Sequence, residues 1–313
     1  MTPLLSVIIP AYGQWPLWPA LRTALMAQTL PQGRFEVIIV NNGPPEAVPA
    51  LDLPPQMRLL HCPVPGSYAA RNHGAAQARG DWLVFTDADC LPGPEWLATL
   101  ANATLANATL ADTTLADTTL ANATLANAAL AKTGGPPSLL AGPVRMIASP
   151  SPSRFEVYDL LRGIPQERYV RHGYAATANL SVPRAVFLAL GGFDAARLSG
   201  GDAAFCRAAG AAGHPVRLVP GAWVGHPCRS DWQALATKAR RVKGGQLRGG
   251  SWHRRALWLG RSLTPPLRQI LRLLGTAAPW GQRWQATRIA LCLWGVELAE
   301  VARLLAGAAP ERR

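Results

Sequence analysis

The sequence predicts an α/β fold with a mostly parallel central sheet flanked by helices. Short apolar runs rich in Val, Ile and Phe alternate with segments in which Leu, Ala and Met recur at helical spacing. Polar or turn residues directly follow three of these runs, as Ala11-Tyr12-Gly13, Asn41-Asn42-Gly43 and Asp87-Ala88-Asp89. These three segments are expected to line one edge of the sheet, where open α/β sheets bind their ligands.

The elements follow a strand, helix, strand order. Strands are expected at residues 6–10, 35–40, 58–61 and 82–86, with helices at 17–30 and 68–78. This order is typical of βαβ units, which build parallel sheets. Later elements are a strand at 139–147, helices at 153–161, 183–190 and 202–210, and a strand at 216–219. A Rossmann-type oxidoreductase is disfavoured because no Gly-x-Gly-x-x-Gly follows the first two strands.

A five-residue unit, Ala-Asn-Ala-Thr-Leu or Ala-Asp-Thr-Thr-Leu, repeats between about residues 100 and 132. Five residues advance a helix by about 500°, so the repeated Leu residues form no single stripe. A β-solenoid like that of pentapeptide-repeat proteins is an alternative, but Ala and Thr stand where those proteins usually have Leu or Phe. We expect a helical insertion lengthened by tandem duplication, because Ala and Leu favour helices.

Composition excludes a disordered chain, since 49% of the 313 residues are hydrophobic, and allows one large domain or two. We expect one domain over residues 1–230 and a basic, Trp-rich helical extension over 231–313. Residues 229–313 hold 16 Lys and Arg against 4 Asp and Glu, which is +12 of the total charge of +13. Five scattered cysteines without Cys-x-x-Cys spacing indicate a reducing compartment.

The basic extension predicts contact with an anionic membrane surface, where amphipathic helices that carry Arg and Trp bind. Basic clusters with aromatics also fit nucleic acid, but no nucleic-acid motif is present and no such partner is expected. A solvated face packed on the first domain is a third interpretation. We expect neither a signal peptide, because a basic n-region is lacking, nor a spanning helix, because no 18 apolar residues run together.

Asp87-Ala88-Asp89 is the most informative short motif. It follows the apolar run at 82–85, which reads as a buried strand. Two carboxylates this close repel each other unless a cation neutralises them, and oxygen ligands favour Mg²⁺ or Mn²⁺. A simple turn is the alternative, because Asp is common in turns and Pro92-Gly93-Pro94 follows.

The motif order over about residues 4–232, the repeat excepted, resembles the family 2 glycosyltransferases, which have the GT-A fold. The matching segments are Ser6-Val7-Ile8-Ile9-Pro10-Ala11-Tyr12, Glu36-Val37-Ile38-Ile39-Val40-Asn41-Asn42-Gly43, Ala70-Arg71-Asn72-His73-Gly74, Asp87-Ala88-Asp89, Gly191-Gly192-Phe193-Asp194 and Gly201-Asp202. The resemblance implies an enzyme that transfers a sugar from a nucleoside diphosphate sugar to a hydroxyl acceptor, with inversion at the anomeric carbon.

The resemblance also implies a donor site. Members of the family bind the base and the ribose with the residues at the positions of Pro10, Tyr12 and Asn41. They contact the nucleotide with the residue at the position of Arg71. The nucleotide-sugar site further includes two residues of the acidic motif, Asp87, which would touch the ribose, and Ala88.

The metal and the catalytic base are implied in the same way. Asp89 would bind the Mn²⁺ or Mg²⁺ that bridges the two phosphates. Asp202 matches the family's catalytic base, which removes the proton of the attacking hydroxyl, although an Asp after two Gly also suits a helix N-cap. His226 falls where many GT-A enzymes supply a late metal ligand, although a lone His is more often structural.

Two departures from the family pattern concern the nucleotide and the acceptor. Asn41-Asn42 replaces the acidic pair often found after the second strand, which puts nucleotide selectivity in doubt. Gly201 replaces the Glu that commonly precedes the base, so a neighbouring acceptor contact is missing.

We expect transfer of a single sugar to a glycan or lipid-linked acceptor, in polysaccharide or glycolipid biosynthesis. Processive members usually show Gln-x-x-Arg-Trp after the base, and this chain has only the wrongly spaced Gln282-Arg283-Trp284. The expected location is cytoplasmic, peripheral on the inner face of the plasma membrane. The alternatives are a noncatalytic protein that binds nucleotide sugar or membrane, and a sugar nucleotidyltransferase, which would normally show a Gly-rich basic loop that residues 11–19 lack.

Overall fold

The computed structural model describes residues 3–112, 136–249 and 251–311. Contacts group the chain into two compact units. The first consists of Met1–Val144, Pro165–Ala195 and Asp202–Gly225, and the second of Arg145–Ile164, Ala196–Gly201 and His226–Arg313. The second unit thus takes in two earlier segments besides the extension expected at 231–313.

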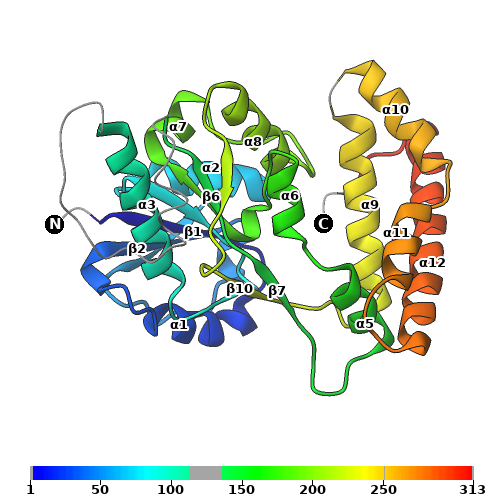
Figure 1. The fold of residues 1–313 in the computed structure, drawn as a ribbon, viewed down its shortest axis with the longest axis horizontal. Helices are drawn as coiled ribbons and strands as arrows, with labels where there is room; N and C mark the ends of the chain where they lie inside the picture. The colour runs from blue at the N-terminus through cyan, green and yellow to red at the C-terminus, as the bar shows by residue number, and fades with distance from the viewer. Residues whose placement is uncertain (1–2, 113–135, 250, 312–313) are drawn as a thin grey trace. The chain divides into compact units, whose positions relative to one another are not determined.

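A sheet forms the centre of the first unit (Figure 1). It has seven strands in the order β3-β2-β1-β4-β8-β6-β9. Its strands are β1 (Leu5–Ala11), β2 (Phe35–Asn41), β3 (Met57–His61), β4 (Trp82–Phe85), β6 (Leu139–Ala141), β8 (Leu180–Pro183) and β9 (Val216–Leu218). Strands β3, β2, β1 and β4 are mutually parallel, as are β6 and β9, whereas β8 is antiparallel to both of its neighbours. The predicted fold class, α/β with a mostly parallel sheet, is confirmed.

Helices cover both faces of this sheet because its strands are apolar on both sides. Successive residues of a strand point to opposite faces, so Val7 and Ile9 join one core cluster and Ile8 joins another. The first cluster includes residues of α1 (Trp18–Met26) and α3 (Trp96–Asp112). The second includes residues of α2 (Ser67–Ala76), α7 (Arg184–Ala189) and α8 (Gly201–Ala211). A short helix, α6 (Gln166–Arg171), also belongs to this unit.

Two expectations about the middle of the chain have different outcomes. The repeat is helical as far as α3 extends, to Asp112, and residues 113–135 lie outside the described part of the chain. The single strand expected at 139–147 is instead two strands, β6 and β7 (Val144–Ile147). The break falls at Gly142-Pro143, where a side chain at Gly142 would collide with the carbonyl oxygen of Ala222, 1.7 Å away.

A second, three-stranded sheet has the order β5-β10-β7. Its other strands are β5 (Leu91–Pro92) and β10 (Val224–Pro227). β5 directly follows the acidic motif and pairs antiparallel with β10, so it holds the end of that loop in place.

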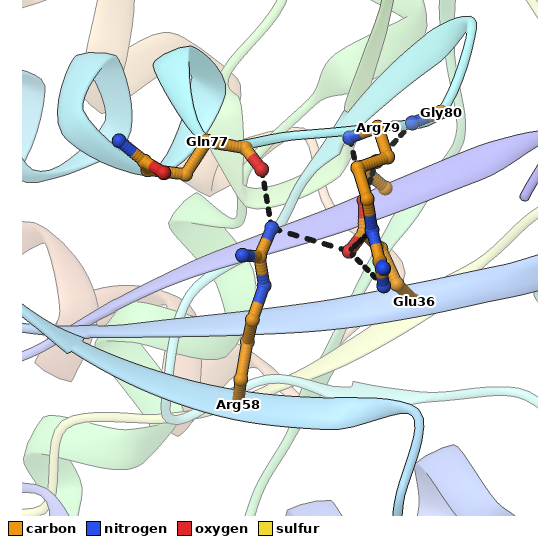
Figure 2. A network of polar contacts seen from close by, with 6 residues as sticks. Glu36, Arg58, Gln77, Arg79 and Gly80 are labelled. Atoms are coloured by element: carbon orange, nitrogen blue, oxygen red, sulfur yellow. Dashed lines mark hydrogen bonds and ion pairs between the residues drawn. The ribbon is translucent and has the colours of Figure 1, made fainter. Parts of the chain in front are cut away.

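Glu36, at the start of β2, is buried in a polar network that joins three strands to the segment after α2 (Figure 2). Its carboxylate accepts hydrogen bonds from the Ser6 hydroxyl at 2.7 Å and the Arg79 backbone N–H at 2.7 Å. The guanidinium groups of Arg58 and Arg79 lie 3.2 and 3.1 Å from its Oε2. Burial acts to raise the pKa of Glu36, but these donors and cations outweigh it and hold the pKa below the ordinary value.

The second unit is helical. Its helices are α5 (Arg154–Arg162), α9 (Trp232–Arg248), α10 (Trp252–Ser262), α11 (Leu267–Leu274) and α12 (Trp280–Leu305). Tyr158 of α5 and Leu235 of α9 are buried in one core cluster with Leu273 and four residues of α12. α5 begins with a capping box formed by Ser153 and Glu156. Among the described residues, no helix is both long and apolar enough to cross a membrane.

Replacing Glu36 with Gln is expected to lower the free energy of unfolding by about 2 kcal/mol at pH 7, because two cations lose their anion. The folded-state pKa of Glu36 is depressed, so its stabilisation is present above the unfolded pKa and is lost as pH falls. The difference between wild type and Glu36→Gln should therefore shrink below about pH 4. Urea unfolding at several pH values measures this, and the exposed Glu46→Gln serves as control. An equal, pH-independent loss in both variants would contradict the account.

Candidate active site

The ends of parallel strands bring the predicted donor-site residues to one edge of the first sheet. β1 pairs with β2 so that Ala11 lies opposite Asn41, and with β4 so that Ile8 lies opposite Phe85. The loops after β1, β2 and β4 consequently start side by side. Residues 12, 42 and 86 begin these loops, so side chains from three distant parts of the sequence meet at this edge.

The loop after β4 holds a compact cluster of possible metal ligands. One ligand atom each of Asp87, Asp89 and Cys90 lies within 4.8 Å of the others. The Cys90 N–H donates to the Asp87 carbonyl at 3.0 Å, so the motif is a turn as well as a carboxylate pair. Burial, with Asp87 and Asp89 nearby, raises the pKa of the Cys90 thiol well above its ordinary value. In the absence of a metal ion the two carboxylates are therefore the stronger donors of this cluster. Such oxygen donors fit Mg²⁺ or Mn²⁺.

Ala88, between the two carboxylates, points the other way. It is buried in the core cluster that contains Val84 and Ala11. A larger side chain at this position would push the acidic loop away from the sheet.

Arg71 of α2 interacts with both the acidic loop and Asp202. Its Nη2 forms an ion pair with Asp87, and its guanidinium carbon lies 5.8 Å from the centroid of the Tyr68 ring. Its charge also acts on Asp202. The side chain is buried, and within the described residues its Nε has no hydrogen-bond partner. A buried, unsatisfied donor at this edge fits a site that a polar ligand completes.

Asp202 lies in the first turn of α8. Its Oδ1 accepts hydrogen bonds from the Ala203 N–H at 2.8 Å and the Tyr68 hydroxyl at 3.3 Å. Desolvation by burial raises the pKa of Asp202 above the ordinary value, and these donors together with Arg71 only partly offset that effect. A carboxyl group whose pKa is raised toward neutral pH is a stronger base once ionised, and is therefore a suitable proton acceptor.

The three residues predicted to bind the nucleoside lie at the ends of β1 and β2. Pro10 is half-buried within β1, while Tyr12 in the next loop is 45% exposed. Asn41 is buried and shapes its own loop: its Oδ1 accepts from the Gly43 N–H at 3.0 Å and its Nδ2 donates to the Gly43 carbonyl at 3.1 Å. A side chain at Gly43 would lie 3.1 Å from the Tyr12 ring, so Gly43 leaves room for that ring.

Sequence reasoning missed two residues that organise this edge. Tyr68 donates to Asp202, and its position one helical turn before Arg71 was a usable signal. Asn72 bonds both backbone groups of Phe193: it accepts from the N–H at 2.9 Å and donates to the carbonyl at 2.7 Å. It thereby holds the Gly191-Gly192 turn, in which both glycines have positive φ, 75° and 72°.

His226 belongs to the second unit, so its expected role as a metal ligand stays a prediction. The side chain is buried, and its Nδ1 lies 2.8 Å from the carbonyl oxygen of Pro227. If Nδ1 carries the proton, the lone pair that a metal needs is on Nε2.

Comparisons with known proteins bear on the family and the fold of this chain. Residues 6–122 match the family model for glycosyl transferase family 2. The chain is 27% identical to the glycosyltransferase AglE of Haloferax volcanii over 95% of this chain and 94% of the relative. A shorter stretch, 28% of this chain, is 34% identical to the uncharacterized glycosyltransferase EpsJ of Bacillus subtilis, covering 27% of that protein.

A solved structure with a similar fold is the mannosyltransferase PcManGT from Pyrobaculum calidifontis, in complex with GDP-Man and Mn²⁺. It has a TM-score of 0.53 and 16% identity, covering 97% of this chain and 88% of that one. S. aureus TarS 1-349 in complex with UDP-GlcNAc has a TM-score of 0.50 and 14% identity, with coverages of 97% and 92%. The family model over residues 6–122 and the full-length relative confirm the predicted resemblance to the family 2 glycosyltransferases, and the solved structures confirm the GT-A fold.

Proposed function

We propose that the chain transfers a single sugar from a nucleoside diphosphate sugar to a hydroxyl acceptor, with inversion at the anomeric carbon. The observation that carries this proposal is the pair of carboxylate sites that both interact with Arg71. One holds two adjacent carboxylates suited to a divalent cation, and the other is a single carboxyl whose pKa is raised.

The donor side would use the acidic loop. Asp89, with Asp87 beside it, would hold Mn²⁺ or Mg²⁺, which when bound stabilises the charge that grows on the departing diphosphate. Arg71 neutralises Asp87 and keeps a buried N–H available, and Tyr12 offers an exposed ring on which a nucleobase can stack. The mannosyltransferase neighbour, solved with GDP-Man and Mn²⁺, supports a donor and a cation of this kind.

The acceptor side would use Asp202. The acceptor oxygen forms a bond to the anomeric carbon while the bond from that carbon to the diphosphate oxygen breaks. The proton of the acceptor hydroxyl passes to a carboxylate oxygen of Asp202. One displacement of this kind inverts the anomeric configuration. Tyr68 and the Ala203 N–H would orient the carboxylate by bonding its Oδ1.

We further propose that the second unit contacts an anionic membrane on the cytoplasmic side, where the acceptor would be a lipid-linked saccharide or a glycan. α11 exposes Leu267 and Leu271 by 62% and 70%, with Arg268 and Arg272 also exposed beside them. On α10, Trp252 is 70% exposed. Apolar side chains next to arginines match the chemistry of an anionic bilayer surface.

Replacing Asp89 with Asn is expected to abolish Mn²⁺-dependent donor binding. A thermal-shift screen of nucleoside diphosphate sugars, GDP-mannose and UDP-GlcNAc included, with and without Mn²⁺ measures it. Asp81→Asn is the matched control, because Asp81 is an exposed carboxylate just before the other end of β4. If no sugar nucleotide stabilises the wild type in the presence of metal, the proposed donor chemistry is wrong.

Asp202→Asn is expected to reduce kcat by a factor of about 10² or more while donor binding persists. The folded-state pKa of Asp202 is raised, so the stability it contributes below its unfolded pKa is lost as pH rises through the folded pKa. At neutral pH the variant should therefore unfold at a higher temperature than the wild type. For the wild type, kcat/KM should rise with pH as Asp202 loses its proton. If Asp202→Asn keeps the activity of the wild type, Asp202 is not the proton acceptor.

Leu271→Ser is expected to weaken binding to anionic vesicles by about tenfold, because a buried Leu contributes about 1.5 kcal/mol or more to apolar partitioning. Flotation with vesicles of anionic and of neutral lipid measures this, and Leu188→Ser, an exposed Leu of α7, is the control. Recovery that is the same with both kinds of vesicle would contradict the membrane proposal.

A further inference from the structure

The second unit contains a cavity of about 120 Å³ between α5, α9, α11 and α12. No step of the proposed transfer uses it. Its size approaches the roughly 150 Å³ of an engineered cavity that takes up benzene. The space therefore accommodates one small chemical group.

Two cations line this cavity. Within the described part of the chain, neither Lys238 of α9 nor Arg162 of α5 forms a hydrogen bond or an ion pair. Lys238 is half-buried, and desolvation, followed by the positive charges of Arg229 and Arg162, lowers its pKa well below the ordinary value. Asp159 acts in the opposite direction but does not compensate.

The carboxylates at the cavity are already engaged with other cations. Asp159 lies 2.9 Å from Arg229 Nη1 and also accepts the Arg229 N–H at 3.1 Å. Glu297 lies 2.8 Å from the Nζ of Lys243. The two cations and two carboxylates of the lining balance, but Arg229 and Lys243 bring the net charge of the six groups at and beside the cavity to +2. This excess is costly in a partly desolvated site unless a ligand supplies an anion.

The remaining walls are largely apolar. The cavity is lined by Leu235, Val242, Leu293 and Trp294. The indole N–H of Trp294 donates a hydrogen bond to the Ser262 carbonyl at 2.8 Å. A ligand that fits has a compact, doubly charged anionic end and an apolar remainder. A phosphomonoester has this charge at neutral pH and three acceptor oxygens, whereas a carboxylate has one charge.

We propose that this cavity binds a phosphomonoester through Lys238 and Arg162, with the apolar walls contacting the group to which the phosphate is attached. The proposal goes beyond the transfer reaction and does not depend on it, because every residue involved lies in the second unit. The phosphate can come from a lipid headgroup or from a soluble phosphate, and the probes below separate the two.

Isothermal titration of the full chain with inorganic phosphate, with dihexanoyl phosphatidic acid and with dihexanoylglycerol tests the proposal. Both phosphates are expected to bind and the neutral glyceride is not. Tighter binding of phosphatidic acid than of inorganic phosphate, by about tenfold, indicates a lipid source, since the walls then contribute. Equal affinities indicate a soluble phosphate.

Lys238→Met is expected to weaken phosphate binding by about tenfold or more, because a charge-assisted contact is lost. It should also raise the midpoint of thermal unfolding, since a desolvated charge is removed, and this gain excludes misfolding as the cause. Arg288→Gln, which removes an exposed charge of α12 outside the lining, should change neither property.

The titrations are repeated with Asp89→Asn, because the donor site of the first unit would also accept phosphate. Phosphate binding that disappears in Asp89→Asn and survives in Lys238→Met would overturn the proposal, as would the absence of phosphate binding in the wild type. Either result leaves the proposed sugar transfer unaffected.

Discussion

The parallel pairing of β1 with both β2 and β4 is the constraint on which the rest of the first unit depends. These strands are apolar on both faces, so they are stable only when helices cover them on both sides. Parallel neighbours need crossover segments, and the carboxyl ends of the strands then fall on the same edge. Tyr12, Asn41 and Asp87 are up to 75 residues apart in the chain, and the register of the parallel strands brings the loops that carry them to one edge.

The pKa values of two desolvated carboxyl groups, one near each end of this sheet, are shifted in opposite directions. At the amino end of β2, Glu36 has a hydroxyl, a backbone N–H and two guanidinium groups, and its pKa is lowered. Near the carboxyl ends, Asp202 has fewer donors, and burial raises its pKa. The network around Glu36 stabilises the fold, whereas burial of the ionised Asp202 carboxylate costs stability, a pattern common at functional sites. Arg71 interacts electrostatically with Asp202 and forms an ion pair with Asp87 of the acidic loop.

Sequence patterns predicted the strands, the flanking helices and the sheet edge because hydrophobic periodicity responds directly to burial on one or two faces. They did not predict the break at Gly142-Pro143, which depends on the approach of Ala222 from a distant segment. Nor did they indicate that Tyr68 would bond Asp202, because that contact joins residues 134 positions apart. The inclusion of α5 in the helical unit was missed for the same reason, since Tyr158 packs with residues of α9, α11 and α12. Family resemblance supplied the roles, and the structure supplies the contacts that make those roles physically reasonable.

The central claim is that one divided site carries the cation on Asp89 and the proton acceptor on Asp202. The most direct measurement is an anomalous difference map, collected at the manganese edge, from crystals grown with Mn²⁺ and a nucleoside diphosphate. The account predicts a manganese peak about 2 Å from a carboxylate oxygen of Asp89, with the diphosphate on the same ion. A diphosphate bound at the edge of β1, β2 and β4 with manganese absent from Asp89, or bound elsewhere on the chain, would contradict it.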